Sequence, residues 1–211
     1  LPEKNYREEE LRAGVMARSI SANGEVIYGT SWDNSDYGML YWEKEGAGFG
    51  RPQWVGEDVR EITPTVMQYQ DGTEYDYNLV NGCICQAQLT KISPSGKWIA
   101  TTYRTETPSA NRQYVEYTYA AAFYNTETGT TTIVEDYGET TGVHVTDDGI
   151  GFIGIGTLGV SAGKVYDLNT HTDLGDTQDW VYDTYGIVIP GGYINHISAD
   201  GRYVLGTSAQ S

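Results

Sequence analysis

Ser198-Ala199-Asp200-Gly201-Arg202-Tyr203-Val204-Leu205-Gly206 is one of four copies of a motif that decides the fold. The copies occupy residues 21–29, 93–101, 146–154 and 198–206, and each follows an isoleucine or a valine. Their turn glycines, Gly24, Gly96, Gly149 and Gly201, are separated by 72, 53 and 52 residues. A recurring step of this size indicates an internal repeat in which each copy is one supersecondary unit.

Each copy predicts two strands joined by a tight turn. The motif begins with Ser or Thr, and its fourth residue is a glycine that can supply the positive φ of a hairpin turn. β-Branched and aromatic residues follow, as is typical of a strand. In the second copy, a third apolar run at 121–124, a turn at 125–129 and a fourth run at 130–135 come next. Four antiparallel strands in roughly 50 residues are typical of a β-propeller blade.

The pattern Ile-Ser-x-[Asp/Asn]-Gly-x-x-[Ile/Val]-x-Gly, followed by Tyr-Trp or Phe-Tyr and later by Thr-Gly, resembles a known type of repeat. It is similar to the propeller-type repeats of bacterial extracellular surface proteins, which are loosely similar to WD40 repeats. The resemblance covers residues 16–211. It implies a β-propeller fold, an extracellular, periplasmic or cell-surface location, and a role as a binding or scaffold module.

We therefore expect an all-β chain of four-stranded antiparallel blades. The predicted blades are residues 16–61 with an insertion at 62–88, then 89–137, 142–183 and a partial blade at 193–211. Residues 1–15 are charged and form either an N-terminal segment or the outer strand of a preceding blade. A half blade exposes an unpaired strand edge, which proteins usually avoid. Either the N-terminal segment completes a small ring, or the chain is a fragment of a larger propeller, which we favour.

The repeat also predicts the core. One repeat position, three residues after the turn glycine, holds Ile27, Ile99, Phe152 and Val204. Another position, just before each motif, holds Ile20, Ile92, Val145 and Ile197. We expect both sets to be buried between blades, because the side chains of a strand alternate between its two faces.

Composition narrows the choice of partners. The chain has 13 basic and 29 acidic residues, which gives a net charge of −16. Such a surface repels nucleic acid and anionic lipid, and it is compatible with cations, neutral glycans and basic protein patches. No run of 18 apolar residues is present, so we expect no transmembrane segment.

Motifs that would indicate catalysis or metal binding are weak. Cys83 and Cys85 are the only cysteines, and we expect them to be small buried apolar residues, because a metal site would need two further ligands. His144 and His196 occupy equivalent repeat positions; a shared metal is conceivable, but we expect hydrogen-bonded histidines. The nucleophile elbow and the zinc-protease motif are both absent. We therefore predict no cofactor and no metal.

The long connections predict where a ligand binds. In an up-and-down blade the tight turns share one face, and the connections at 32–38, 62–89, 104–114, 156–163 and 180–193 share the other. Variable loops on a rigid scaffold usually carry function. The predicted binding residues are Trp32, Asp33, Asn34, Asp36, Tyr37, Trp180 and Tyr185. Aromatic rings beside polar side chains suit a sugar, although the same rings could instead pack between blades.

The sequence leaves three functional hypotheses. The favoured one is a secreted or cell-surface β-propeller module that binds a protein or a glycan through its long-loop face. The alternative is a carbohydrate-active enzyme, a glycoside hydrolase or lyase, that uses carboxylates on that face. The third is a purely structural part of a larger surface protein. An enzyme predicts two acidic groups around a deep pocket, whereas a binding module predicts a shallow aromatic surface.

Overall fold

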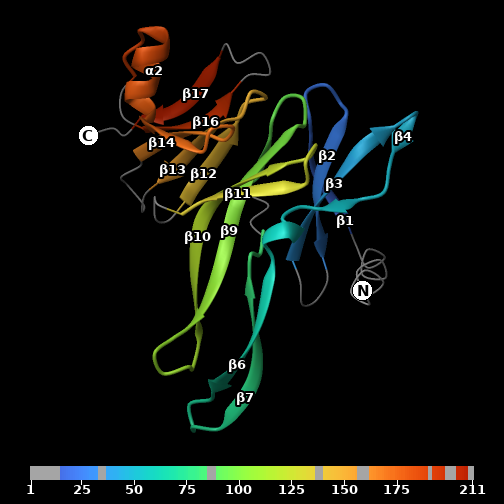
Figure 1. Ribbon diagram of the computed structural model, residues 1–211, viewed down its shortest axis with the longest axis vertical. Helices are drawn as coiled ribbons and strands as arrows, with labels where there is room; N and C mark the ends of the chain where they lie inside the picture. The colour runs from blue at the N-terminus through green and yellow to red at the C-terminus, as the bar shows by residue number, and fades with distance from the viewer. Residues whose placement is uncertain are drawn as a thin grey trace.

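The computed structural model describes residues 15–32, 37–84, 89–135, 140–155, 162–189, 192–197 and 203–208. In these ranges the chain is mostly β-strand, with one α-helix, α2 (Thr177–Tyr185), and one 3-10 turn, η1 (Glu57–Val59). The predicted all-β class is therefore confirmed. Figure 1 shows sheets stacked side by side, with α2 at one end of the molecule and a long arm at the other.

The strands of the described residues are arranged in four sheets and one separate hairpin. Sheet 1 contains β1 (Val15–Ile20), β2 (Val26–Trp32), β3 (Tyr37–Glu45), β4 (Gly48–Phe49) and β5 (Gln53–Trp54). Sheet 2 contains β8 (Lys91–Ile92), β9 (Trp98–Pro108), β10 (Val115–Asn125) and β11 (Thr130–Val134). Sheet 3 contains β12 (Thr140–Val145), β13 (Ile150–Ile155), β14 (Ala162–Asp167) and β15 (Thr172–Asp176). Sheet 4 contains β16 (Gly192–Ile197) and β17 (Val204–Ser208), and the hairpin contains β6 (Glu61–Gln68) and β7 (Glu74–Asn81). In sheets 2 and 3 each strand pairs with its neighbours in the chain, as the repeat predicts.

The sheets pack face to face through shared apolar clusters. Sheets 1 and 2 share a cluster that includes Tyr28, Tyr41, Ile99 and Tyr124. Sheets 2 and 3 share a cluster that includes Trp98, Phe123, Val145 and Ile153. On the far side of sheet 3, Phe152 and Val165 pack against Trp180 of α2. Sheets 2 and 3 thus each turn one face to the preceding sheet and the other face to the sheet or helix that comes next in the chain.

The tight turns also connect one sheet to the next. The Asn23 side-chain amide in the turn of sheet 1 donates a hydrogen bond of 2.9 Å to the carbonyl of Ser95 in the turn of sheet 2. Ser95 in turn donates from its backbone amide (2.8 Å) and its hydroxyl (2.7 Å) to the Asp147 carboxylate in the turn of sheet 3. These three turns therefore hold one end of the stack together.

The third copy of the motif has a shorter turn than the second. The backbone amide of Ser93 donates to the carbonyl of Trp98, five positions further on. The amide of Thr146 donates to the carbonyl of Ile150, which is only four positions further on. A shift of one residue moves every side chain of a strand to the opposite face. The sequence alignment of the third copy with the others is therefore off by one residue.

This shift corrects part of the predicted core. Gly151, not Phe152, is the structural equivalent of Ile99, and it faces sheet 2, where a Cβ atom would come within 2.8 Å of the Phe123 ring. Phe152 is buried as predicted, but on the opposite face, with its ring 5.3 Å from that of Trp180. The prediction that Phe152 shares the repeat position of Ile99 is wrong.

The repeat predicts that the residue before each motif is buried. It is fully buried in only one of the sheets in which its side chain is described. Val145 is buried and Ile92 is half-buried, both against the preceding sheet. Ile20 is 52% exposed, which contradicts the prediction, because its face of sheet 1 has no preceding sheet among the described residues. Ile99 is fully buried and Ile27 half-buried, while the side chains of Val204 and Ile197 lie outside the described part.

The predicted insertion is a hairpin, and two of the other predicted connections are shorter than expected. The insertion at 62–88 contains β6 and β7, paired from Glu61 opposite Asn81 to Gln68 opposite Glu74. The polar segment at 104–112 belongs largely to β9, which continues to Pro108 before a turn leads into β10. Part of the predicted connection at 180–193 forms the second half of α2.

Candidate binding surface

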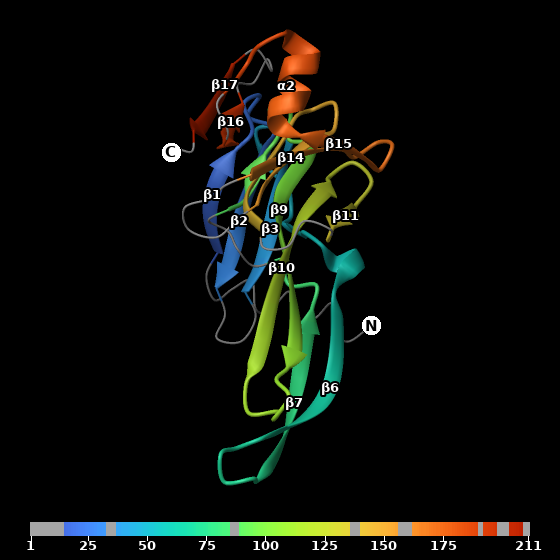
Figure 2. The ribbon, with the colours of Figure 1, turned by 90° about the vertical axis from the view of Figure 1, so that its left-hand side faces the viewer.

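The most prominent feature outside the stacked sheets is an arm formed by two hairpins. β9 and β10 pair along their full length, whereas β8 and β11 pair with them only near the tight turn. Residues 103–108 and 115–120 therefore extend beyond the part of sheet 2 that β8 and β11 flank, and the β6–β7 hairpin lies beside them. We call residues 61–81 and 103–120 the arm. It projects from the sheets at the end opposite α2 in both perpendicular views (Figures 1 and 2).

The turn at the end of β9 explains why this hairpin forms. Ser109-Ala110-Asn111-Arg112 has the same turn as Ser21-Ala22-Asn23-Gly24. The Ser109 hydroxyl donates to Asn111 at 2.8 Å, as the Ser21 hydroxyl does to Asn23 at 2.6 Å. Arg112 takes the position of the glycine and has a φ of 56°. The motif therefore has a further copy, which the missing glycine conceals in the sequence.

Glu106 joins the two hairpins at the base of the arm. Its buried carboxylate accepts hydrogen bonds from the Val80 amide (3.0 Å), from the Tyr77 hydroxyl (3.4 Å) and from the Arg104 guanidinium (2.7 Å). Its own amide donates to the Asn81 side chain at 2.9 Å. A buried carboxylate is tolerated when a cation and several donors surround it. Glu106 thus holds β7 against β9.

Backbone hydrogen bonds fix the same junction. The Gly82 amide donates to the Arg104 carbonyl at 3.1 Å, and the Arg104 amide donates to the Cys83 carbonyl at 3.0 Å. Nearer the tip, the Gln68 amide donates to the Arg112 carbonyl at 2.9 Å. The guanidinium of Arg104 also lies 5.0 Å from the centre of the Tyr117 ring, a cation–π distance. The hairpins are thus joined at two levels, which makes the arm a defined surface.

The β6–β7 hairpin has an inner and an outer face. Met67 and Leu79, on the inner face, are buried, and Tyr75 and Tyr77 on the same face are half-buried. Ile62 and Val66 on the outer face are exposed. A two-stranded hairpin isolated in water is only marginally stable. The burial of its inner face therefore stabilises the β6–β7 hairpin.

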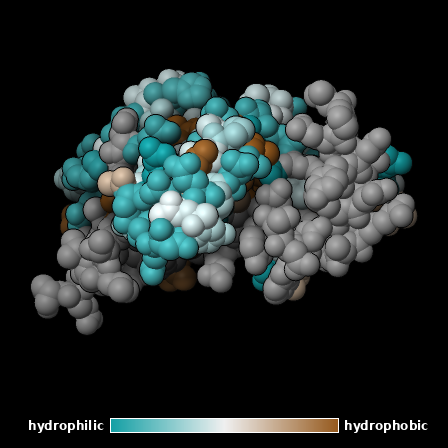
Figure 3. All heavy atoms as spheres, turned by 90° about the horizontal axis from the view of Figure 1, so that it is seen from below, coloured by the Kyte–Doolittle hydropathy of each residue, from teal (hydrophilic) through white to brown (hydrophobic). Residues whose placement is uncertain are grey.

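The exposed surface of the arm combines tyrosine rings with carboxylates. Its exposed tyrosines are Tyr69, Tyr114 and Tyr117, and its exposed acidic residues are Glu61, Asp71, Glu74, Asp76 and Glu116. Seen from the side of the arm, the coloured surface is mostly hydrophilic (Figure 3). At the tip, the hydrogen bond from the Thr73 amide lowers the pKa of Asp71, which keeps this carboxylate ionised well into the acidic range.

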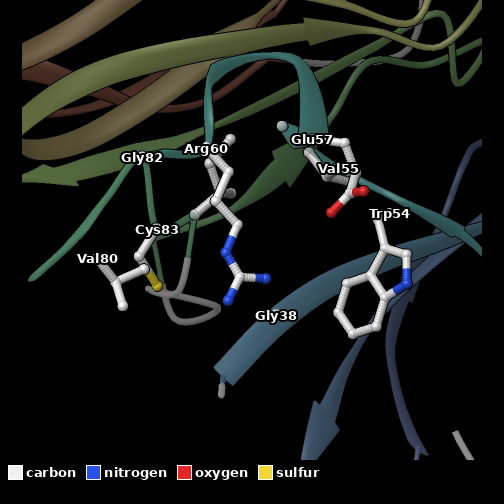
Figure 4. A pocket seen from close by; sticks show the side chains of 10 residues that line it. Gly38, Trp54, Val55, Glu57, Arg60, Val80, Gly82 and Cys83 are labelled. Carbon is white, nitrogen blue, oxygen red and sulfur yellow. The ribbon is translucent and has the colours of Figure 1, made fainter. Parts of the chain in front are cut away.

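A small hollow lies where the arm meets sheet 1. Trp54 and Gly38 border it on one side and Val80 and Cys83 on the other, with the Arg60 guanidinium extending between them (Figure 4). Its volume of about 20 Å³ is enough for about one water molecule. Glu57 is the one carboxylate among its lining residues. A glycosidase needs two carboxylates around a substrate, so this hollow gives no support to the enzyme alternative.

The structure places the first group of predicted site residues near the arm. Trp32 ends β2 and pairs with Tyr37, the first residue of β3, at the end of sheet 1 away from the tight turn. The next residue, Gly38, borders the hollow together with Val80 of the arm. Asp33, Asn34 and Asp36 lie outside the described residues, as do the side chains of Trp32 and Tyr37. Their role in binding stays a prediction.

The second predicted group lies elsewhere. Trp180 and Tyr185 belong to α2, at the opposite end of the molecule from the arm in both views (Figures 1 and 2). Trp180 is half-buried, with its ring 5.3 Å from Phe152 and 5.8 Å from Tyr185. Tyr185 is exposed. The structure thus separates the two groups that the sequence placed on one face, and it gives Trp180 a packing role.

The remaining candidates are the cysteines and the possible metal ligands. Cys83 is buried, while Cys85 lies outside the described part. Among the described residues, no three His, Cys, Asp or Glu side chains gather closely enough to hold a metal ion. In the same ranges, no helix is both long and apolar enough to cross a membrane. No protein-family model and no curated protein matches the chain.

Proposed function

We propose that the protein is a secreted or cell-surface binding module of β-propeller architecture whose arm contacts a protein or glycan ligand. The observation that carries this proposal is the arm itself. It is fixed at its base by a buried network, and its outer surface presents tyrosines and carboxylates that the packing of the sheets does not require. Such rings can bury area on binding at little conformational cost.

The propeller architecture is supported by the order of the sheets. The motif recurs at the start of each of the four sheets, and sheets 1 to 3 stack in chain order through equivalent faces. The excess of acidic residues favours a neutral glycan or a basic protein surface over a nucleic acid. The ends of β2 and β3, which carry Trp32 and Tyr37, extend the proposed contact surface from the arm onto sheet 1.

The test compares two tyrosines of equal exposure at opposite ends of the molecule. Tyr114 on the arm is 57% exposed and Tyr182 on α2 is 56% exposed. Arrays of neutral glycans and of basic peptides are probed with the wild type, with Tyr114→Ser, with Tyr182→Ser and with Trp32→Ala. We expect Tyr114→Ser and Trp32→Ala to weaken binding by about tenfold or more, with the melting temperature unchanged. Binding that is lost in Tyr182→Ser and retained in Tyr114→Ser would contradict the proposal.

A further inference from the structure

We propose that the outer face of the β6–β7 hairpin binds an extended segment of a partner protein that carries both apolar and basic side chains. This ligand class depends on the proposed function, in which the arm makes the contact. The hairpin belongs to a range that the structure describes without a gap, residues 37–84. It lies on one side of β9 and β10 in both views (Figures 1 and 2). Its inner face is buried through Met67 and Leu79, and the outer face takes no part in this packing.

The register of the two strands defines the residues of this outer face. Side chains of a strand alternate between its two faces, so the outer face consists of every second residue of β6 and β7. From the base of the arm to its tip, the face contains four cross-strand pairs: Ile62 with Val80, Pro64 with Asn78, Val66 with Asp76, and Gln68 with Glu74. The face is therefore apolar near the base and acidic near the tip.

The apolar part of the face is exposed and aliphatic. Ile62 is 50% exposed, Val66 is 37% exposed, and Pro64 between them is also exposed. The rings of Tyr75 and Tyr77 belong to the inner face instead. A sugar packs best on the flat side of an aromatic ring, whereas aliphatic side chains of a protein bury apolar area well against Ile62 and Val66. The outer face therefore favours a protein over a glycan.

The acidic part of the face has no positive charge within the hairpin to balance it. Residues 61–81 contain no Lys, Arg or His, and they contain four carboxylates: Glu61, Asp71, Glu74 and Asp76. None of the four forms an ion pair among the described residues. Elsewhere on the arm, Arg104 is paired with Glu106, and Arg112 alone cannot balance the remaining acidic groups. Because interacting surfaces carry complementary charge, we expect basic side chains in the partner where it contacts the tip.

Pro64 determines how such a segment docks. It has no backbone N–H and stands in the middle of β6, so a partner strand cannot pair continuously along this edge. The segment must instead lie on the face and bind through side chains. From Ile62 to Gln68 the face spans about 20 Å, the length of an extended segment of about seven residues. We expect such a segment to place apolar side chains near the base and basic ones near the tip.

An amide NMR titration of the full chain with the peptide Val-Ser-Val-Ser-Lys-Ser-Lys tests the proposal. We expect the peptide to shift the amides of Val66 and Asp76, and added salt to weaken its binding. Val66→Ser should weaken binding by about tenfold through lost apolar burial. Asp76→Lys should weaken it by about tenfold or more, because attraction becomes repulsion. Asp183→Lys, at an exposed position on α2, is the matched control and should bind like the wild type.

A charge reversal separates recognition from a loss of structure. The second peptide has glutamates in place of the lysines, and the wild type should not bind it. The double variant Glu74→Lys with Asp76→Lys should prefer this second peptide to the first, at an unchanged melting temperature. A purely structural role of the two carboxylates would not reverse the preference.

The outcomes also separate this proposal from the proposed function. Equal binding of a peptide with serines in place of the valines would show that charge alone drives the contact, which overturns the proposal. A first peptide that causes no shift at all would overturn it too; if neutral glycans then bind through Tyr114, the proposed function still stands. Shifts confined to α2, with binding lost in Asp183→Lys, would contradict both.

Discussion

Glu106→Ala should release the β6–β7 hairpin from β9 without unfolding the stacked sheets. The substitution removes the acceptor of the Val80 amide, of the Tyr77 hydroxyl and of the Arg104 guanidinium. Removing one member of a buried ion pair costs about 3–5 kcal/mol, and a hydrogen bond to a charged group contributes about 1.5–3 kcal/mol. The Arg104 side chain is partly exposed and can regain water. We therefore expect the arm to be destabilised by about 2–3 kcal/mol.

Hydrogen exchange measures this effect where it should occur. The amides of Val80, Gly82 and Arg104 lie at the junction of the hairpins, and we expect them to exchange about 30-fold or more faster in Glu106→Ala. The amide of Ile99, inside sheet 2, should keep its protection. Glu116→Ala, at an exposed carboxylate of the same arm, is the control and should change neither. Unchanged exchange at the three junction amides in Glu106→Ala would refute the role we assign to this carboxylate.

Three further predictions concern the sheets. Ile99→Ala should lower the free energy of unfolding by about 2–5 kcal/mol in a urea titration. Ile20→Ala, at an exposed position, should change the free energy of unfolding by less than half as much. Equal changes in the two variants would contradict the burial assigned to Ile99. Gly96→Ala should lower the free energy of unfolding more than Gly24→Ala in the same assay. Both glycines have positive φ, but only at Gly96 would a Cβ atom meet the Val26 side chain, at 2.4 Å. Equal losses of stability in the two variants would contradict a clash with Val26. Burial raises the pKa of Tyr28, and it also raises the pKa values of the interacting pair Tyr41 and Tyr124. Because these folded-state values lie above the unfolded value of about 10, their contribution to stability is complete below that pH and is lost as the pH rises further. A tyrosinate absorbance titration with parallel circular dichroism should show these groups ionising together with unfolding, and their ionisation near pH 10 in the folded state would contradict this.

The sequence predicts the sheets well because the repeat carries both the turn and the strands. Ser93 and Gly96 form the predicted turn, and Ile99 is buried as expected. The same reasoning fails at Phe152, because a turn can lose one residue without losing its Thr or its Gly. Nothing in the residues 146–149 shows which carbonyl will accept the hydrogen bond of Thr146. The register is set by backbone geometry, which a motif alone does not reveal.

The arm is not predicted from the sequence, although signals for it are present. Asp71-Gly72 is flanked by segments in which apolar and polar residues alternate, with Tyr75, Tyr77 and Leu79 on one face. An Asp-Gly pair between such segments is a strong hairpin signal. Ser109-Ala110-Asn111 repeats Ser21-Ala22-Asn23, but Arg112 replaces the expected glycine. The pairing of Glu106 with Val80 and Tyr77 could not be predicted, because it depends on how two hairpins pack. The separation of Trp180 from Trp32 depends likewise on α2, a helix where the sequence predicts a loop.

The contact between Gly151 and Phe123 limits how this chain can vary by recombination. Repeats of one ancestry are often exchanged, duplicated or deleted as whole units. Here the ring of Phe123 occupies the space that a side chain at position 151 would need. A unit copied from sheet 1 or sheet 2 into the third place would bring Ile27 or Ile99 to that position and clash with the ring. The order of the second and third repeats is therefore constrained by shape, and a new unit can enter at that junction only together with a smaller residue at position 123.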